Sequence, residues 1–379
     1  MDTRVYLAAC PDYADADAAV RRVLDAFGGA AELLKGQDKL RAPRVLVKPN
    51  LVMPKKPDAA ATTHPAVVAA VCRAFAEAGA DVSILDSSGA PHTGAMLGLL
   101  YRNCGMDKAA EAAGAALCYD TASRRVDNPA NRTLKRFHCL SPVLDADLVV
   151  TVGKTKTHGL AYFTGAVKNM FGVLPGLEKP NMHRKYPAAA DFLSAIVDIC
   201  ETVQPGFALL DGVVGMEGEG PTGGTPKALG AILGGLNPHA VDLAACRLMS
   251  LRPERVPSLV EGASRGLVPR SADQLEWLGD DPKPLVTAFR PPGTERLGGF
   301  ILRFLLPKAL SRRLRSWTAR YPVISSRCVG CGDCERICPQ KCIEMRGKLA
   351  VIDPKTCIKC YCCHEFCPAK AIDFEKKHG

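Results

Sequence analysis

Long apolar segments are missing from this sequence. No stretch of about twenty residues, the length that a membrane-spanning helix needs, is free of both charge and proline. The first residues, Met-Asp-Thr-Arg-Val-Tyr, contain no basic segment leading into a long apolar core, which argues against a signal peptide. Low-complexity tracts are also missing. We therefore expect a globular protein of the cytoplasm.

Cysteine is sparse over most of the chain. Ten of the 17 cysteines fall between Cys328 and Cys367, and the other seven are scattered singly. A secreted disulfide framework would spread its cysteines through a small chain. The clustering instead predicts reduced thiolates that bind metal.

Acidic residues are nearly absent from one segment. Residues 282–327 contain ten Lys/Arg and one acid, although the whole chain has a net charge of +10. The basic character therefore belongs to a connector, which argues against a nucleic-acid-binding protein. Within this segment, residues 296–320 combine seven Lys/Arg with apolar side chains. Two interpretations remain open: an interdomain helix packed on the body, or a segment that contacts an anionic membrane or an acidic redox partner.

The cysteine-rich region contains one pattern twice, CxxCxxCxxxCP, with an offset of 29 residues. It resembles the bacterial two-cluster ferredoxins, in which the fourth cysteine of each run ligates the other [4Fe–4S] cluster. The resemblance implies one cluster on Cys328, Cys331, Cys334 and Cys367, and a second on Cys357, Cys360, Cys363 and Cys338. Zinc is the alternative, because CxxC pairs also bind zinc, but zinc sites rarely use this order of four cysteines. We expect Cys342 and Cys362 not to be ligands.

Residues 1–281 alternate apolar strand candidates with helix candidates, the pattern of an α/β domain with a mostly parallel sheet and flanking helices. Residues 322–379 form the small α+β ferredoxin-like domain. The expected strands are Val5–Ala9, Arg44–Lys48, Asp81–Leu85, Ala146–Val152, Phe207–Leu210 and Ala228–Gly234. The expected helices are Ala14–Phe27, Pro65–Ala78, Met106–Ala113, Gly159–Phe171, Ala188–Thr202 and Pro238–Leu251.

Polar side chains follow several of these strands. Ligands of open α/β sheets bind beyond the carboxyl ends of the strands, so we expect a pocket there, with loop lysines that support folding only weakly. It would suit an anion held by charged and amide donors. The candidate binding residues are Lys48, Asn50, Lys154, Lys156, Lys168, Asn169 and Asp211, and Asp86 also follows a strand.

Three residues are candidates for proton transfer. His158 ends the segment Gly153–His158, which we expect to be a loop running into a helix, and Glu217 and Glu219 alternate along a glycine-rich loop. If that loop is extended, both carboxylates face the pocket. Residues 218–223 match a dinucleotide fingerprint formally, but two prolines and an acid between the glycines argue against it. No flavin fingerprint is present.

Four segments together resemble the uncharacterised family known as domain of unknown function number 362. They are Lys48–Asn50, Gly153–His158, Gly165–Gly172 and Asp211–Gly220, and the resemblance covers most of residues 40–250. It implies a shared body fold and pocket, and members often carry ferredoxin domains. It implies no known reaction.

Two classes of function follow. The first is an oxidoreductase in which the clusters relay single electrons to or from an anionic substrate in the body. The second is a non-catalytic electron-transfer or adaptor subunit that docks a redox partner, in one version at a membrane surface.

Overall fold

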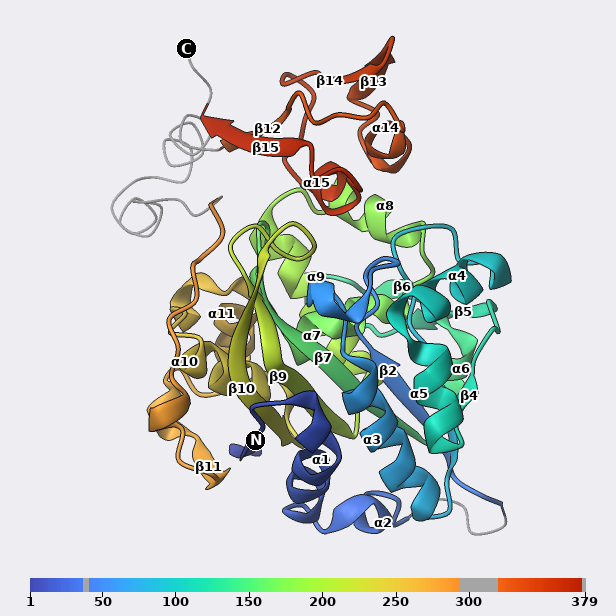
Figure 1. Cartoon of the computed structure of the whole chain (residues 1–379), viewed down its shortest axis with the longest axis vertical. Helices are drawn as coiled ribbons and strands as arrows, with labels where there is room; N and C mark the ends of the chain where they lie inside the picture. Colours follow the sequence, from blue (N-terminus) through green and yellow to red (C-terminus); the bar gives the residue numbers. More distant parts are fainter. Residues whose placement is uncertain (37–40, 294–319, 377–379) are drawn as a thin grey trace.

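The computed structural model describes residues 1–36, 41–293 and 320–376. Of the predicted connector, residues 282–321, positions 294–319 lie outside the described residues. Figure 1 shows an α/β body with a smaller cysteine-rich domain at one end of it. None of the helices in the described ranges combines the length and apolar character that a membrane crossing requires.

The body is built on a nine-stranded sheet with the order β11-β1-β10-β9-β7-β2-β3-β4, to which β8 adds beside β7. The pairs β2/β3, β2/β7, β3/β4, β7/β9 and β1/β11 are parallel, whereas β10 is antiparallel to β1 and β9, and β8 to β7. The predicted mostly parallel sheet is therefore confirmed. The strands are β1 (Arg4–Ala9), β2 (Arg44–Pro49), β3 (Asp81–Ile84), β4 (Ala116–Leu117), β7 (Leu148–His158), β8 (Tyr162–Thr164), β9 (Phe207–Glu217), β10 (Thr225–Gly235) and β11 (Glu276–Gly279).

Helices cover both faces of the sheet. Val45 and Val47 of β2 pack into one core cluster and Leu46 packs into another, so both faces of the strand are buried, as its continuous apolar run predicted. The first face carries α1 (Ala16–Asp25), α2 (Gly29–Leu33), α3 (Pro65–Glu77), α4 (Gly94–Cys104) and α5 (Met106–Ala113). The second carries α6 (Ser141–Asp145), α7 (Ala166–Asn169), α8 (Glu178–Lys185), α9 (Ala189–Val203), α10 (Pro238–Leu248) and α11 (Pro257–Ser264).

Short 3₁₀ turns and one hairpin complete the body. The turns span Tyr13–Asp15, Pro57–Ala59, Met170–Val173, Pro253–Arg255, Ala272–Gln274 and Lys283–Leu285, and the hairpin joins β5 (Ser123–Asp127) to β6 (Arg136–Leu140).

Two helices begin at the predicted proline signals. His64 Nδ1 accepts a hydrogen bond from the Ala66 amide before α3, and Asn237 Oδ1 accepts one from the His239 amide before α10. Each cap satisfies an amide that has no partner within its helix, while proline at the first helical position loses no hydrogen bond.

The region after residue 152 differs from the prediction. We expected a loop at Gly153–His158 and a helix at Gly159–Phe171, but β7 continues to His158, β8 follows, and only the four residues of α7 and a 3₁₀ turn are helical. Pairing with β8 and β9 stabilises the extension. All eleven residues of β7 are buried, including two lysines. Charged side chains inside a buried strand are rare, which is why the sequence favoured a loop.

The body also extends past the predicted boundary at 281. Phe289 is 4% exposed and belongs to a core cluster of the body. The Arg290 amide donates to Glu217 Oε2 at 2.9 Å, and the Gly293 amide donates to Glu219 Oε1 at 2.8 Å. These contacts attach residues up to 293 to the sheet.

The cysteine-rich domain packs on the loops at one end of the sheet (Figure 1). Thr222 Oγ1 donates to the Glu365 carbonyl at 2.8 Å, and a Cβ added to Gly89 would lie 2.4 Å from the Phe366 ring. The second contact is so close that a larger residue at position 89 would displace the Phe366 ring. The elements of this domain are β12 (Arg320–Ile324), β13 (Ile343–Arg346), β14 (Leu349–Ile352), β15 (Ile372–Lys376), α14 (Asp333–Ile337) and α15 (Cys362–Glu365).

Candidate functional site

The eight cysteines of the two motifs line two separate cavities. The fourth cysteine of each run crosses to the cavity of the other run, as the ferredoxin resemblance implied. The cavity of Cys328, Cys331, Cys334 and Cys367 is lined elsewhere mainly by apolar side chains, among them Ile324, Met345 and Ile372. The cavity of Cys338, Cys357, Cys360 and Cys363 also contains Cys342. Each cavity thus presents the four thiolates that a [4Fe–4S] cubane requires.

Backbone amides point at three of these sulfurs, one of them Cys357 Sγ, which accepts from the Lys359 amide at 3.4 Å. The Ala371 amide donates to Cys367 Sγ at 3.2 Å, and the Cys342 amide donates to Cys338 Sγ at 3.4 Å. Such N–H···S bonds stabilise thiolate charge. The donor set and its surroundings therefore fit iron–sulfur clusters.

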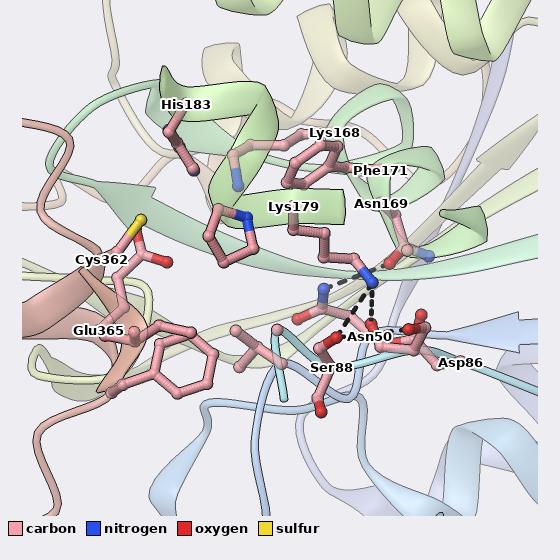
Figure 2. A pocket seen from close by; sticks show the side chains of 17 residues that line it. Asn50, Asp86, Ser88, Lys168, Asn169, Phe171, Lys179, His183, Cys362 and Glu365 are labelled. Carbon is pink, nitrogen blue, oxygen red and sulfur yellow. Dashed lines mark hydrogen bonds between the residues drawn. The ribbon is translucent and has the colours of Figure 1, made fainter. Parts of the chain in front are cut away.

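A third cavity, of about 70 Å³, lies between the body and the cysteine-rich domain. Figure 2 shows Cys362 and Glu365 on one side of it and the lysines of the body on the other. We call it the interdomain pocket. Its walls are formed by Asn50, Val52, Asp86, Ser87, Ser88, Gly89, Lys168, Asn169, Phe171, Gly172, Lys179, Pro180 and His183 of the body, and by Ile337, Cys362, Glu365 and Phe366 of the cysteine-rich domain.

Two lysines give this pocket its positive charge. Lys179 Nζ donates to the carbonyls of Ser87, Ser88 and Leu174 at 2.8–3.1 Å, and burial lowers its pKa to about 7. Lys168 forms neither a hydrogen bond nor an ion pair with any residue in the described ranges, so its ammonium is available to a ligand. Burial lowers the pKa of Lys168, whereas the nearby Glu365 carboxyl raises it.

A buried network fixes the polar wall beside these lysines. Lys48 Nζ donates to Asp86 Oδ1 at 2.6 Å and to Asn169 Oδ1 at 3.1 Å. Burial lowers the pKa of Lys48, and Asp86 opposes that shift. Lys156 Nζ donates to Asn50 Oδ1 at 2.6 Å, and burial lowers the pKa of Lys156 to about 7.

This network sets the orientation of the Asn50 amide. Because an ammonium only donates hydrogen bonds, the Asn50 atom facing Lys156 has to be the oxygen. Asn50 Nδ2 then donates one proton to Asn169 Oδ1 at 3.2 Å. Asn50 itself lines the pocket, so its oriented amide forms part of the polar wall.

His158 lies at the end of β7, beneath the cysteine-rich domain. Its Nδ1 accepts from the Leu160 amide at 3.1 Å, and its Nε2 is 3.4 Å from Glu365 Oε1. Burial holds the pKa of His158 well below its usual value, and burial raises the pKa of Glu365. The proposed role of His158 in proton transfer stays a prediction.

Lys154 and Asp211 lie away from the pocket. Both side chains are 0% exposed, and Lys154 Nζ donates to Asp211 Oδ2 at 2.7 Å and to the Tyr13 hydroxyl at 2.7 Å. Asp211 also accepts from the His64 amide at 2.9 Å. Burial lowers the pKa of Lys154, and the attraction of Asp211 opposes this shift. These residues form a closed network inside the sheet rather than a pocket wall, contrary to our expectation.

Glu217 and Glu219 do not face the interdomain pocket either. Glu217 is paired with Arg290 at 2.8 Å and Lys227 at 3.1 Å, and Glu219 accepts from the Gly293 amide. Instead of an extended loop, residues up to Glu217 belong to β9, which pairs with β10. The two carboxylates bind the segment that leaves the body, so the expectation of two pocket carboxylates is wrong.

Of the predicted binding residues, Asn50, Lys168 and Asn169 line the pocket, while Lys48 and Lys156 support them from behind. Sequence reasoning missed Lys179 and His183, which lie on a helix that the periodicity did not reveal. It also missed Cys362 and Glu365, because nothing in the cysteine motif indicates which side of that domain meets the body.

Comparisons with known proteins agree with the division of the chain into an α/β body and a cysteine-rich domain. A family model described as domain of unknown function (DUF362) matches residues 45–247, and one described as a 4Fe-4S dicluster domain matches residues 327–374. Both resemblances inferred from the sequence are confirmed.

Individual relatives are more distant. A thylakoid-associated protein of Synechocystis is 29% identical over 270 residues, which span 71% of this chain and 80% of that protein. A ferredoxin-like protein from the nif region of Sinorhizobium fredii is 49% identical over 35 residues, 9% of this chain and 55% of that protein. The lactate racemase apoprotein of Thermoanaerobacterium thermosaccharolyticum aligns at a TM-score of 0.41 with 14% identity, over 66% of this chain and only 57% of that structure.

Proposed function

The chain belongs to the family of the domain of unknown function DUF362 and ends in a 4Fe-4S ferredoxin domain with an electron-transfer role, and from this premise we propose an oxidoreductase. Two [4Fe–4S] clusters relay single electrons between a redox partner and a small anion bound in the interdomain pocket. The clusters supply one-electron exchange, and the protein supplies binding and orientation.

The composition of the pocket wall carries this proposal. Ile337 and Cys362 line the pocket, and they immediately precede Cys338 and Cys363. Both of those cysteines belong to the same cavity, which we call the proximal cavity. The cavity of Cys328, Cys331, Cys334 and Cys367 is the distal cavity. A ligand in the pocket therefore lies next to the ligands of one cluster, and the other cluster is free to serve a partner.

The opposite wall selects for negative charge. Lys168 offers an ammonium with no competing partner among the described residues, and Asn50 offers an oriented N–H. Lys179 adds a positive charge whenever it is protonated. Phe171 and Phe366 supply apolar contacts. A cavity volume of about 70 Å³ suits only a small ligand, so a compact carboxylate or another oxyanion is the expected ligand.

Metal analysis tests the cofactor content. Anaerobically purified protein should contain about eight irons and eight inorganic sulfides per chain, as two four-iron clusters require. Cys334→Ser should impair one cluster, because that sulfur lines the distal cavity. Cys342→Ser and Cys362→Ser should leave the iron content unchanged. Zinc without sulfide in anaerobic material would contradict the proposal.

Substitution of Lys168 tests the pocket. Lys168→Met should weaken binding of whichever anion oxidises the reduced clusters by about 1–3 kcal/mol, the free energy of a charge-assisted hydrogen bond. This corresponds to an affinity about 5- to 150-fold lower. The assay follows bleaching and recovery of the cluster absorbance while small carboxylates and phosphate are added to reduced protein. Lys108→Met, an exposed site on α5, is the matched control. Equal responses of both variants and the parent protein would refute the anion pocket.

One comparison favours a second candidate, an electron-transfer adaptor at a membrane surface. A relative is named as thylakoid-associated, and residues 296–320 carry seven Lys/Arg and no acid. Vesicles containing anionic lipid should then sediment with the full chain at low salt and release it at high salt. Absence of binding, together with anion-dependent cluster oxidation, would leave the enzyme as the function.

A further inference from the structure

The two cysteine repeats share several backbone features. Positions 29 residues apart share left-handed backbone, as at Gly332 and Tyr361, whose φ values are 74° and 63°. The amide bonds to the fourth cysteine sulfurs also repeat, since Ala371 and Cys342 are equivalent positions. Equivalent positions of the two halves can therefore be compared directly, and the side chains that differ between them can be identified.

Two thiols occur only around the proximal cavity. Cys342 replaces Ala371, and its Sγ lies 3.4 Å from Cys338 Sγ. Cys362 replaces Asp333 and stands between Cys360 and Cys363, two cysteines of the proximal set. Asp333 instead binds Arg336 at 2.5 Å. Cys342 thus contacts a cysteine of the proximal set and Cys362 is a chain neighbour of two others, whereas the distal set has no counterpart among the described residues.

Cys362 also touches the interdomain pocket. It is 4% exposed and lines the pocket next to Glu365, as Figure 2 shows. Lys168 lines the same pocket. Thiol donors and a nearby cation are therefore concentrated on one side of the ferredoxin domain.

Donors at the ligand sulfurs raise the reduction potential of an iron–sulfur centre, because a reduced centre carries one more negative charge and gains more from each hydrogen bond. A cation at the same side acts in the same direction. The asymmetry between the two halves thus separates the reduction potentials of two otherwise similar centres.

We propose that Cys342 and Cys362 set the proximal centre at a higher reduction potential than the distal one, so that electrons pass inward and the anion in the pocket is reduced. This inference rests on the proposed function. A low-potential one-electron carrier outside the protein is oxidised at the distal side, and the anion takes up the same number of electrons, one at a time. Cys342 and Cys362 are positioning residues, which act through the ligand sulfurs and exchange no electrons themselves.

A redox titration of the anaerobic full chain, followed by the electron paramagnetic resonance of the reduced centres, tests this. Cys342→Ala and Cys362→Ala should each lower the higher of two potentials and leave the lower unchanged. Cys362→Ser keeps a donor and should restore much of the difference. Ala371→Cys installs the missing thiol on the distal side and should raise the lower potential. Cys72→Ala, a buried cysteine of α3, is the control.

The outcomes separate the two proposals. Fewer than two clusters in the parent protein would refute the proposed function. Two clusters whose potentials are unchanged in both alanine variants would overturn only the role of the thiols. Loss of iron in Cys342→Ala or Cys362→Ala would identify the replaced cysteine as a cluster ligand. That result would also overturn the proposed role of the thiols.

Discussion

Replacing Lys154 should destabilise the body severely, although its place in the sequence suggested a harmless loop charge. The Lys154–Asp211 pair is fully buried, and removing one partner of a buried pair costs about 3–5 kcal/mol. Lys154→Met keeps the length of the side chain, so a cavity adds little. Asp211 retains the His64 amide and the Tyr13 hydroxyl as donors, which places the cost near the low end, about 3 kcal/mol.

Thermal unfolding of the cluster-loaded protein measures this cost. At about 2–4 °C per kcal/mol for a domain of this size, Lys154→Met should lower Tm by about 6–12 °C. Lys168→Met is the matched control, because Lys168 has no ion pair with a described residue, and its Tm should fall by about 2 °C or less. Equal Tm values for the two variants would refute the assignment of Lys154 to the core and return it to the pocket hypothesis.

Three further predictions concern the pocket and the domains. Because the pKa of Lys179 is lowered from 10.5 to about 7, anion affinity should fall as pH rises through 7, and Lys179→Met should flatten this profile. The unfolded chain keeps that proton up to about pH 10.5, so the contribution of Lys179 to stability should rise between pH 7 and 10.5 in urea titrations. A chain of residues 1–293 should unfold cooperatively. A chain ending at residue 281 should be less stable, because it lacks Phe289, which packs in the core. Equal unfolding midpoints for the two chains would contradict a domain boundary at residue 293. Gly89→Val should displace Phe366 and increase proteolysis between the domains, whereas Gly94→Ala, which meets no atom within 4 Å, should not.

The pocket could be predicted only in part. Asn50, Lys168 and Asn169 were found because polar residues after buried strands gather at the carboxyl edge of a parallel sheet. Lys154 and Asp211 fulfil the same rule but pair with each other inside the sheet. Sequence position does not distinguish these outcomes, because the length of a strand depends on the neighbours that pair with it.

The sequence by itself determined the chemistry and the general architecture. Cysteine spacing is local, so the eight candidate ligands and their crossed arrangement follow from one motif and its resemblance. Apolar runs and proline caps located the central strands of the sheet and several of the longer helices for the same reason, since they act within a few residues. Only the tertiary structure decided which side of the ferredoxin domain faces the body. The contacts of Gly89 with Phe366 and of Thr222 with Glu365 join residues far apart in the chain. These long-range contacts bring Cys362 to the lysines of the body and create the interdomain pocket.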